Sequence, residues 1–411
     1  MNIGRDIIKD FVRWKERSDH KPLIVQGARQ IGKTTAIRMF GECNYNTSLS
    51  LFDKSEELKK LFRRTKDIKR ILQELHLFTE APLRPGETLF FFDEIQECEE
   101  ALNALKYFDE DAPKYHIVAA GSLLGVALNR VGKTFPVGKV NFLQMYPVTF
   151  KEYLACAVER LYYFVEELQK IAPLPTIVAN QLSEHYRRYQ VCGGLPYVTR
   201  AMLNGEGLGN IEEKLSELLK AYANDFCNHV ERKDITRIHE IWQSLPSQLA
   251  RENKKFIFRV IREGARAREY DVALLWLVLA GMVYRVKLTE TPRLPLNFYE
   301  DTTAFKAYIL DVGLLRKLAN LPAEVLLSSN AMFTEFKGSV AENQVLTSLL
   351  AQGYETPHYW TLQGNKAEVD FLVQDGLNIL PTEVKSEERI SGKSFAEYDK
   401  NTALNYVSVI R

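Results

Sequence analysis

The sequence predicts a multidomain α/β protein with a parallel-sheet domain near its N-terminus. Three observations support this fold class. The chain is 411 residues long, an apolar run at 23–25 leads into a glycine-rich loop and a helix, and a second apolar run at 88–92 ends in two carboxylates. A chain of this length exceeds what one core normally supports, so two to four domains are expected. Strand, loop and helix in that order are the unit from which parallel sheets are built.

The glycine-rich loop fits the phosphate-binding pattern G-x-x-x-x-G-K-[ST] without a mismatch. Its glycines let successive backbone N–H groups point at phosphate oxygens, and the positive end of the following helix adds to the attraction. Lys33 is expected to reach the β- and γ-phosphates, and the Thr34 hydroxyl to hold Mg²⁺. A plain glycine-rich turn is the alternative. The residues expected to bind the nucleotide are Gly27, Ala28, Arg29, Gln30, Ile31, Gly32, Lys33, Thr34 and Thr35.

Composition and charge argue against several classes of protein. The formal net charge is +1, so a nucleic-acid partner would have to contact a local basic patch. The five cysteines contain no C-x-x-C pair, which argues against a cysteine-rich zinc site and suits a reducing cytoplasm. The polar N-terminus does not resemble a signal peptide, and the longest apolar run, 272–284, is about half as long as a membrane span. No membrane partner is expected.

The first domain is expected to continue with alternating helices and strands. Residues 1–20 are predicted as a helix before the first strand, and the helix after the loop is predicted to end at Gly41. Residues 47–52 alternate like a strand, and 55–75 have the pattern of one helix. Further strands are predicted at 116–120 and 140–145.

The apolar strand predicted at 88–92 presents Asp93 and Glu94 at its carboxyl end. Asp93 would support a hydrated Mg²⁺, and Glu94 would polarise the water that attacks the γ-phosphate. Carboxylates on an exposed turn would explain the same two residues without chemistry. Downstream of a complete phosphate-binding loop, however, they favour a site for ATP hydrolysis.

The arrangement of these motifs resembles a family of bacterial and archaeal AAA+ ATPases that carry a nuclease-like C-terminal domain of unknown function. The resemblance rests on the loop, Asp93-Glu94, Gly121-Ser122 and the segment 146–153. Within that segment, Thr149 and Glu152 have the spacing of a helix-start capping box. The resemblance implies an AAA+ core over 1–154 that binds ATP and Mg²⁺.

The resemblance also bears on two further positions. Ser122 stands where AAA+ proteins place a sensor of the γ-phosphate, but the N-cap of a helix over 123–128 explains it equally well. The relatives usually have Gly-Arg before the strand at 140–145, whereas this chain has Gly138-Lys139. If the family arginine contacts the γ-phosphate, this chain has a lysine, Lys139, in its place. Arg130 is then a candidate for the role of that arginine.

The resemblance extends through the middle of the chain. Residues 155–230 are predicted as a helical lid, and 192–196 resembles the Gly-Gly-x-Pro segment of the family. Residues 231–330 are predicted to hold a winged-helix-like module and a linker, with a two-stranded wing at 283–288 and 296–299. The basic residues of this module could contact DNA, as winged helices do, or could simply be solvated. They are Arg251, Lys254, Lys255, Arg259, Arg262, Arg266 and Arg268.

The last predicted domain, 331–411, carries a second acidic motif. Two strands are predicted on either side of an Asp375-Gly376 hairpin turn. The hairpin can bring Asp370 beside Glu383, and two such carboxylates can bind Mg²⁺ or Mn²⁺ with a lysine nearby. The other predicted elements are a helix at 336–350, a helix at 394–404 and a strand at 406–410.

This acidic arrangement is similar to the restriction-endonuclease-like PD-(D/E)XK fold, whose motif has a proline where this chain has Val369. An ion pair between Asp370 and Lys385 would explain the same residues without catalysis. The resemblance implies a candidate nuclease metal site made of Glu342, Asp370, Glu383 and Lys385.

Three functions stay open on the sequence. The first is an ATP-driven machine or switch acting on nucleic acid, in which Lys33, Glu94 and Ser122 serve hydrolysis and Thr34 and Asp93 hold the Mg²⁺ of ATP. The second is a nucleotide-dependent switch for a protein partner, with a degenerate nuclease-like domain. The third is an ATP-regulated nuclease that depends on a metal. An oligomer is compatible with each of them.

Overall fold

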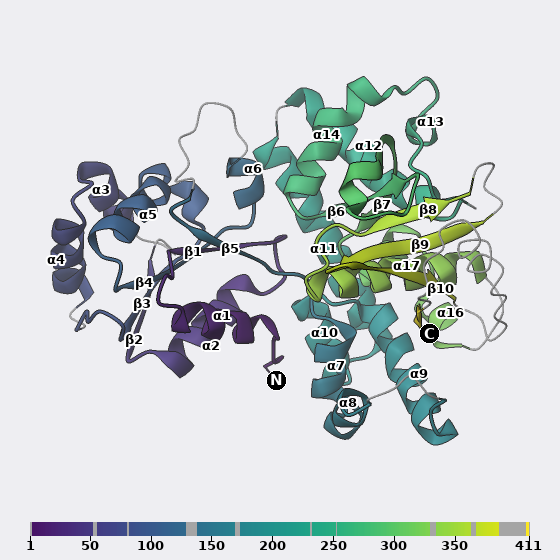
Figure 1. Ribbon diagram of the computed structural model, residues 1–411, viewed down its shortest axis with the longest axis horizontal. Coiled ribbons are helices and arrows are strands. Elements are labelled where there is room, and N and C mark those ends of the chain that lie inside the picture. The colour runs from purple at the N-terminus through teal and green to yellow at the C-terminus, as the bar shows by residue number, and fades with distance from the viewer. Residues whose placement is uncertain are drawn as a thin grey trace. The chain divides into compact units, whose positions relative to one another are not determined.

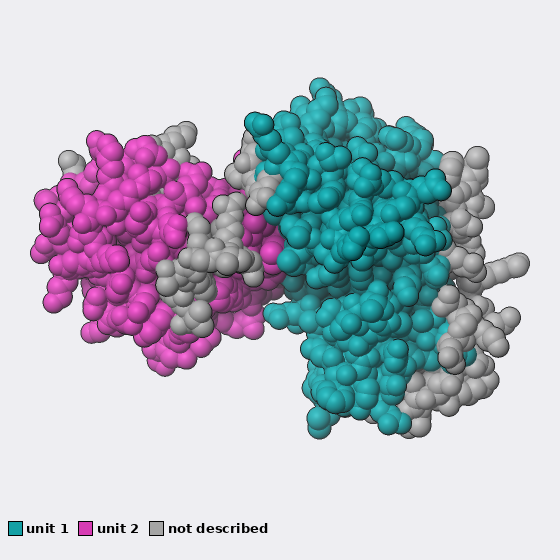
Figure 2. Space-filling model, turned by 90° about the horizontal axis from the view of Figure 1, so that it is seen from above, with its two compact units in different colours: residues 1–3, 146–278, 282–411 teal, residues 4–145, 279–281 magenta. Residues whose placement is uncertain are grey.

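The chain forms two compact units in the computed structural model, which describes residues 2–51, 56–79, 82–128, 138–168, 173–230, 232–251, 253–328, 334–362, 367–385 and 408–410. The N-terminal unit comprises Gly4–Met145 with Leu279–Gly281 (magenta in Figure 2). The C-terminal unit comprises Met1–Ile3, Tyr146–Val278 and Met282–Arg411 (teal in Figure 2).

The N-terminal unit is built on a five-stranded parallel sheet in the order β2-β3-β4-β1-β5. Because all five strands run in one direction, the loops that follow them lie at the same edge of the sheet, where α/β proteins bind ligands. The three neighbours β3, β4 and β1 carry the loops that matter for the site. The strands are β1 (Leu23–Gln26), β2 (Thr47–Leu51), β3 (Thr88–Phe92), β4 (His116–Ala120) and β5 (Asn141–Gln144).

Helices cover both faces of this sheet, which explains why β3 and β4 are apolar at almost every position. In Figure 1, α1 and α2 lie on one side of the sheet and α3, α4 and α5 on the other. The helical elements are α1 (Ile7–Glu16), α2 (Lys33–Asn44), α3 (Glu56–Arg64), α4 (Ile68–Thr79), the short 3₁₀ helix η1 (Ile95–Glu97), α5 (Glu99–Asp111) and α6 (Leu124–Leu128).

Two predicted helix boundaries in this unit are wrong. The single helix expected at 55–75 is two helices, because Asp67 accepts a hydrogen bond from the Lys69 N–H and so starts α4 separately. Helix α2 continues through Gly41 and ends at Asn44. A side chain at Gly41 would meet the Ser48 Oγ at 2.2 Å, so this glycine allows α2 to pack closely on β2 and does not end the helix.

The C-terminal unit begins with helices, as predicted for the segment 155–230. Helix α7 starts with the predicted capping box, in which the Glu152 N–H donates to Thr149 Oγ1 and the Thr149 N–H donates to the Glu152 carboxylate. The helices are α7 (Phe150–Ala157), α8 (Glu159–Glu166), α9 (Thr176–Cys192), α10 (Pro196–Leu203) and α11 (Leu208–His229).

A six-stranded mixed sheet in the order β11-β10-β9-β8-β6-β7 completes the C-terminal unit. Strand β6 pairs antiparallel with β7 and parallel with β8, so the sheet is continuous across the domain boundary predicted at residue 330. The strands are β6 (Val283–Thr289), β7 (Glu300–Ile309), β8 (His358–Thr361), β9 (Glu368–Asp375), β10 (Asn378–Val384) and β11 (Ser408–Ile410).

The hairpin formed by β6 and β7 is therefore part of a larger sheet. The wing strand predicted at 296–299 is wrong, because these residues form the 3₁₀ helix η2 (Leu296–Tyr299) and the partner of β6 is β7. The remaining helices are α12 (Arg232–Leu249), α13 (Phe258–Ile261), α14 (Ala267–Leu279), α15 (Val312–Leu318), α16 (Ala323–Leu327) and α17 (Thr334–Ala351).

The acidic hairpin of the last segment has the predicted form. Strands β9 and β10 pair antiparallel around the Asp375-Gly376 turn, and β11 lies parallel to β10, where a strand was predicted at 406–410. Helix α17 packs against β10 and runs alongside β9 and β10 in Figure 1. The helix predicted at 394–404 lies outside the described residues.

His116 lies in an aromatic cluster at the amino-terminal edge of the first sheet. Its ring centroid is 4.3 Å from that of His20, and the rings of Trp14 and Tyr45 also contact it. Burial, followed by the charges of His20 and Lys15, lowers the pKa of His116 from 6.5 to about 4. The folded protein therefore holds this imidazole neutral at pH values where the unfolded chain would protonate it.

We expect the N-terminal unit to lose stability as the pH falls from about 6.5 to about 4, because only the unfolded state binds a proton at this histidine in that window. The loss is on the order of 3 kcal/mol. The His116→Phe variant, which keeps a ring in the cluster, should show a flatter dependence of unfolding free energy on pH in urea titrations. The His76→Gln variant, at an exposed position, is the control. If the unfolding free energy depends on pH equally in wild type and in His116→Phe, His116 is not the group responsible.

Candidate functional site

The phosphate-binding loop joins β1 to α2, and its first and last glycines are required by its conformation. Gly27 has φ 145°, and a Cβ there would lie 2.4 Å from the Met145 carbonyl oxygen. Gly32 has φ 94° in the left-handed region, which glycine tolerates far better than other residues. Helix α2 begins at the next residue, so its free N–H groups face the loop.

Lys33 lies folded into this loop. Its Nζ donates to the carbonyl oxygens of Gly27 at 2.8 Å and Ala28 at 2.7 Å, and the residue is 7% exposed. Burial lowers the pKa of Lys33 to about 8, against the opposing charges of Glu94 and Asp93. Both acceptors are neutral, so a phosphate group in the loop would give the ammonium a charged partner. The residues of the loop fit a bound nucleotide.

Thr34 and Asp93 come together from α2 and the end of β3. The Thr34 Oγ1 donates to Asp93 Oδ1 at 3.1 Å, and Asp93 is 6% exposed. A hydroxyl and a carboxylate side by side at the phosphate-binding loop are oxygen ligands of the type that Mg²⁺ takes together with nucleotide phosphates. These two residues therefore fit the metal predicted for them.

The half-buried carboxylate of Glu94 is held in place by a network of hydrogen bonds. Its carboxylate accepts from Ser122 Oγ at 2.8 Å, from the Ser122 N–H at 3.1 Å and from Gln96 Nε2 at 2.6 Å. Burial would raise the pKa of Glu94, but the hydrogen bonds from Gln96 and Ser122 outweigh it and lower the pKa. Glu94 also has φ 47°, a conformation uncommon for a side-chain-bearing residue and often found at functional sites.

The structure thus brings Lys33, Thr34, Asp93, Glu94 and Ser122 to one edge of the parallel sheet. Sequence reasoning missed two residues that contact this group, Gln96 and Arg38, and a third, Arg5, that contacts the phosphate-binding loop. Gln96 follows Glu94 by two positions, and Arg38 lies one helical turn after Thr34, a spacing that could have identified it. The contacts of the missed residues are Gln96 to Glu94, Arg38 to Asp93 Oδ2 at 4.0 Å, and Arg5 to the Ile31 carbonyl oxygen at 2.8 Å.

Lys139 lies at the other edge of the same sheet. Lys139 comes just before β5, which pairs parallel with β1 from Leu23 onward. It therefore lies at the start of these strands, whereas the phosphate-binding loop follows the end of β1. Its Nζ pairs with Asp109 and Glu110, each at 3.3 Å, near the end of α5. Lys139 therefore does not reach the loop of its own chain. Arg130, the predicted substitute, lies outside the described residues.

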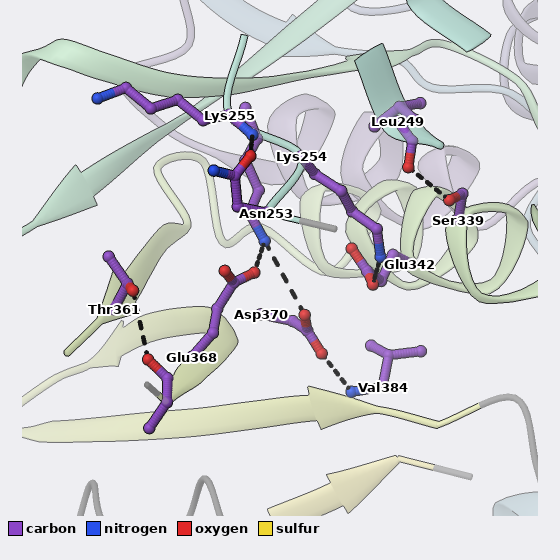
Figure 3. Close-up of polar contacts among 12 residues, drawn as sticks. Leu249, Asn253, Lys254, Lys255, Ser339, Glu342, Thr361, Glu368, Asp370 and Val384 are labelled. Carbon is purple, nitrogen blue, oxygen red and sulfur yellow. Dashed lines mark hydrogen bonds and ion pairs between the residues drawn. The ribbon is translucent and has the colours of Figure 1, made fainter. Parts of the chain in front are cut away.

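Two of the candidate nuclease residues, Glu342 and Asp370, lie in one polar cluster of the C-terminal unit together with Lys254 (Figure 3). Glu342 on α17 pairs with Lys254 and accepts a hydrogen bond from the Tyr308 hydroxyl at 3.1 Å. Asp370 on β9 accepts from the Val384 N–H at 2.8 Å. Glu383 on β10 pairs with Lys385. The partner of Lys385 is thus Glu383 and not Asp370, which the sequence analysis offers as an alternative.

Lys306 is the residue of this cluster that sequence reasoning missed. It comes from β7, is fully buried, pairs with Glu368 and lies 3.9 Å from Asp370 Oδ1. Burial would lower the pKa of Lys306, but Glu368, Glu342 and Asp370 raise it above the ordinary value. A lysine among the apolar residues of 304–309 was the signal available in the sequence, because lysine is rarely buried unless it is paired.

Comparison with protein families gives a match for the segment that carries the first of these two sites. Residues 19–154 match the family model of an AAA domain. The N-terminal unit therefore contains an AAA-type P-loop ATPase domain. The rest of the chain matches two models described as domains of unknown function, DUF8612 over residues 183–325 and DUF4143 over residues 337–409. No curated protein sequence shows a significant match to the chain.

Several solved structures resemble the chain at low identity. The Walker-type ATPase PABY2304 of Pyrococcus abyssi is 15% identical, with 77% of this chain and 96% of that chain covered and a TM-score of 0.48. The Aeropyrum pernix ORC2 protein in ADPNP-ADP complexes is 13% identical, with 85% and 96% covered and a TM-score of 0.40. Likenesses this distant carry no inference about what the chain binds.

The part of the chain described here contains no helix that is both long and apolar enough to cross a membrane. The longest apolar run of the sequence falls mostly in α14, which packs Tyr270, Leu274 and Leu277 into the core. It is thus a helix of a globular core, as the sequence indicates.

Replacing Ser122 by Ala should slow ATP turnover about tenfold, because it removes one of the hydrogen bonds that hold the Glu94 carboxylate. Nucleotide affinity should change less than about twofold, since Ser122 contacts Glu94 and not the loop. Steady-state hydrolysis and equilibrium binding of a fluorescent ATP analogue measure the two effects. Ser50→Ala on an exposed position of β2 is the control, and an unchanged rate in Ser122→Ala would show that Ser122 does not position the carboxylate.

Proposed function

We propose that the AAA domain binds ATP with Mg²⁺ and hydrolyses it to switch the conformation of the chain during a transaction on nucleic acid. The main support for ATP hydrolysis is the hydrogen bond from Thr34 Oγ1 to Asp93 Oδ1, at 3.1 Å, beside the buried Lys33. It joins the two nucleotide motifs into one site, with one oxygen ligand from each.

Each residue of the site has a role in this proposal. The loop N–H groups and Lys33 bind the phosphates, and Thr34 and Asp93 hold Mg²⁺, which when bound neutralises phosphate charge. Glu94 acts as the base that orients the attacking water, and Ser122 and Gln96 hold its carboxylate in position. The low pKa of Glu94 keeps this group ionised at neutral pH, as a base requires.

The proposed nucleic-acid partner rests on exposed arginines of the C-terminal unit. Lys254 is paired with Glu342 and Arg262 with Glu269, so these two are partly neutralised. The exposed arginines of the segment are the better candidates for contacts to phosphates of DNA. They are Arg251, Arg259, Arg266 and Arg268.

A nucleotide-dependent switch for a protein partner is the second candidate function. It is favoured by the pairing of Glu342 with Lys254 and of Glu383 with Lys385, since engaged carboxylates suit a nuclease-like domain that has lost its activity. An ATP-regulated nuclease requires instead that metal-dependent nicking of DNA disappears in both Asp370→Ala and Lys385→Ala. Nicking that persists in both variants would come from another site.

Changing Lys33 to Ala should abolish ATP turnover and weaken nucleotide binding, because the variant loses the cation of the phosphate-binding loop. Changing Glu94 to Gln should reduce turnover at least about 100-fold and leave binding nearly intact, because it removes only the base. Hydrolysis assays with Mg²⁺ and binding isotherms for an ATP analogue separate the two variants.

Lys114→Ala, which removes an exposed lysine from the same unit, is the control for Lys33→Ala. A normal rate in Lys33→Ala would refute the proposed ATP site. Loss of binding in Glu94→Gln would indicate that Glu94 supports the fold of the loop region and is not the base.

Duplex DNA should stimulate ATP turnover several-fold in the wild type, and the triple variant Arg259→Ala, Arg266→Ala, Arg268→Ala should lose this stimulation while keeping the basal rate. The exposed Arg160 and Arg200, replaced together by Ala, serve as the control. The stimulation should also decline steeply with salt, because the contacts are to phosphates. Turnover indifferent to DNA would favour the protein-partner switch.

A further inference from the structure

The C-terminal carboxylate cluster contains protein cations where the PD-(D/E)XK resemblance implies a metal ion. The Lys306 ammonium lies between Glu368, with which it forms an ion pair, and Asp370, whose Oδ1 is 3.9 Å away. The Lys254 ammonium pairs with Glu342 Oε1 from another direction (Figure 3). Both lysines are removed from bulk water, Lys306 completely and Lys254 with a side chain 15% exposed.

Three further oxygens of the predicted metal ligands have partners as well. Glu342 Oε2 accepts from the Tyr308 hydroxyl, and Asp370 Oδ2 accepts from the Val384 N–H. Glu383 Oε1 pairs with Lys385. Within the described ranges, no three acidic, histidine or cysteine side chains are arranged to hold a metal ion. The residues predicted as metal ligands therefore do not fit a divalent cation.

We propose that Lys306 and Lys254 replace a divalent metal in this cluster, so that the C-terminal unit is a metal-independent domain. The carboxylates of Glu342, Glu368 and Asp370 face these two ammonium groups of the same chain. A divalent ion that approached Asp370 would meet the fixed positive charge of Lys306 about 4 Å away, and the two cations would repel each other in a poorly screened interior.

The origin of the two lysines supports this assignment. Glu342, Asp370 and Glu383 belong to the segment that matches one family model, 337–409, whereas Lys254 and Lys306 belong to the segment that matches another, 183–325. The sheet joins the two segments through β6 and β8 and so brings β7, with Lys306, to the acidic strands. The segment 183–325 thus supplies the cations that face Glu342 and Asp370, whereas Glu383 pairs with Lys385 of its own segment.

Mn²⁺ titration of the full-length, nucleotide-free protein tests the proposal. Free Mn²⁺ is measured by its electron paramagnetic resonance signal, and the Asp370→Asn variant is subtracted so that Mn²⁺ held by the AAA domain cancels. We expect no difference between wild type and Asp370→Asn. A wild-type site for Mn²⁺ that is lost in Asp370→Asn, or in Glu383→Gln, would overturn the proposal.

The Lys306→Met variant provides the complementary measurement, because Met keeps most of the length of the unbranched side chain and removes its charge. We expect it to gain one Mn²⁺ site at least about tenfold stronger than any in wild type, and to lose that site again when Asp370→Asn is added. Lys255→Met is the matched control, since the neighbouring Lys255 side chain is exposed and points away from Glu368 and Asp370 in Figure 3.

A folded Lys306→Met protein without a new Mn²⁺ site would also overturn the proposal, because the carboxylates would then not form a cation site at all. If Lys306→Met does not fold, Mn²⁺ titration of Lys254→Met makes the same test at Glu342. In that variant the Tyr308 hydroxyl still donates to one oxygen of Glu342. Circular dichroism and thermal unfolding establish that each variant is folded before titration.

Discussion

The parallel pairing of β1, β4 and β3 is the constraint on which the ATP site depends. Because the three strands run in one direction, the loop after β1, the carboxylates after β3 and Ser122 after β4 lie at one edge of the sheet. Buried apolar strands maintain this arrangement, with Ile24, Phe90 and Ile117 essentially inaccessible to water. The hydrogen bond from Thr34 to Asp93 and those from Ser122 to Glu94 are consequences of that pairing.

The C-terminal unit is subject to a different constraint, which is the need of buried charges for partners. Four carboxylates lie close to the β9 and β10 hairpin, and an isolated ionised carboxylate is very costly to bury. Lys254, Lys306 and Lys385 supply the opposite charges, and Tyr308 and the Val384 N–H supply hydrogen bonds. Such a network fixes the relative positions of α17, β7, β9 and β10, whatever else the unit does.

Much of the AAA domain could be predicted from local patterns. The phosphate-binding loop, the apolar strand before Asp93 and the capping box at Thr149 each depend on residues within a few positions of one another. Predictions that required knowledge of distant neighbours were wrong. The local pattern predicts a helix end at Gly41 because it does not show the close approach of Ser48. It predicts a strand at 296–299, although the strand that pairs with β6 is β7.

The sequence by itself determined which residue types are present for nucleotide chemistry, because a loop that binds phosphate needs glycines, a lysine and a hydroxyl at fixed spacing. Only the tertiary structure decided how the acidic motif of the C-terminal unit is used. Lys306 is 64 positions before Asp370, and Lys254 is 88 positions before Glu342, so only the fold brings each lysine to its carboxylate. Spacing along the chain specifies a motif, but the charge that faces a buried carboxylate is set by strands that pair across the fold.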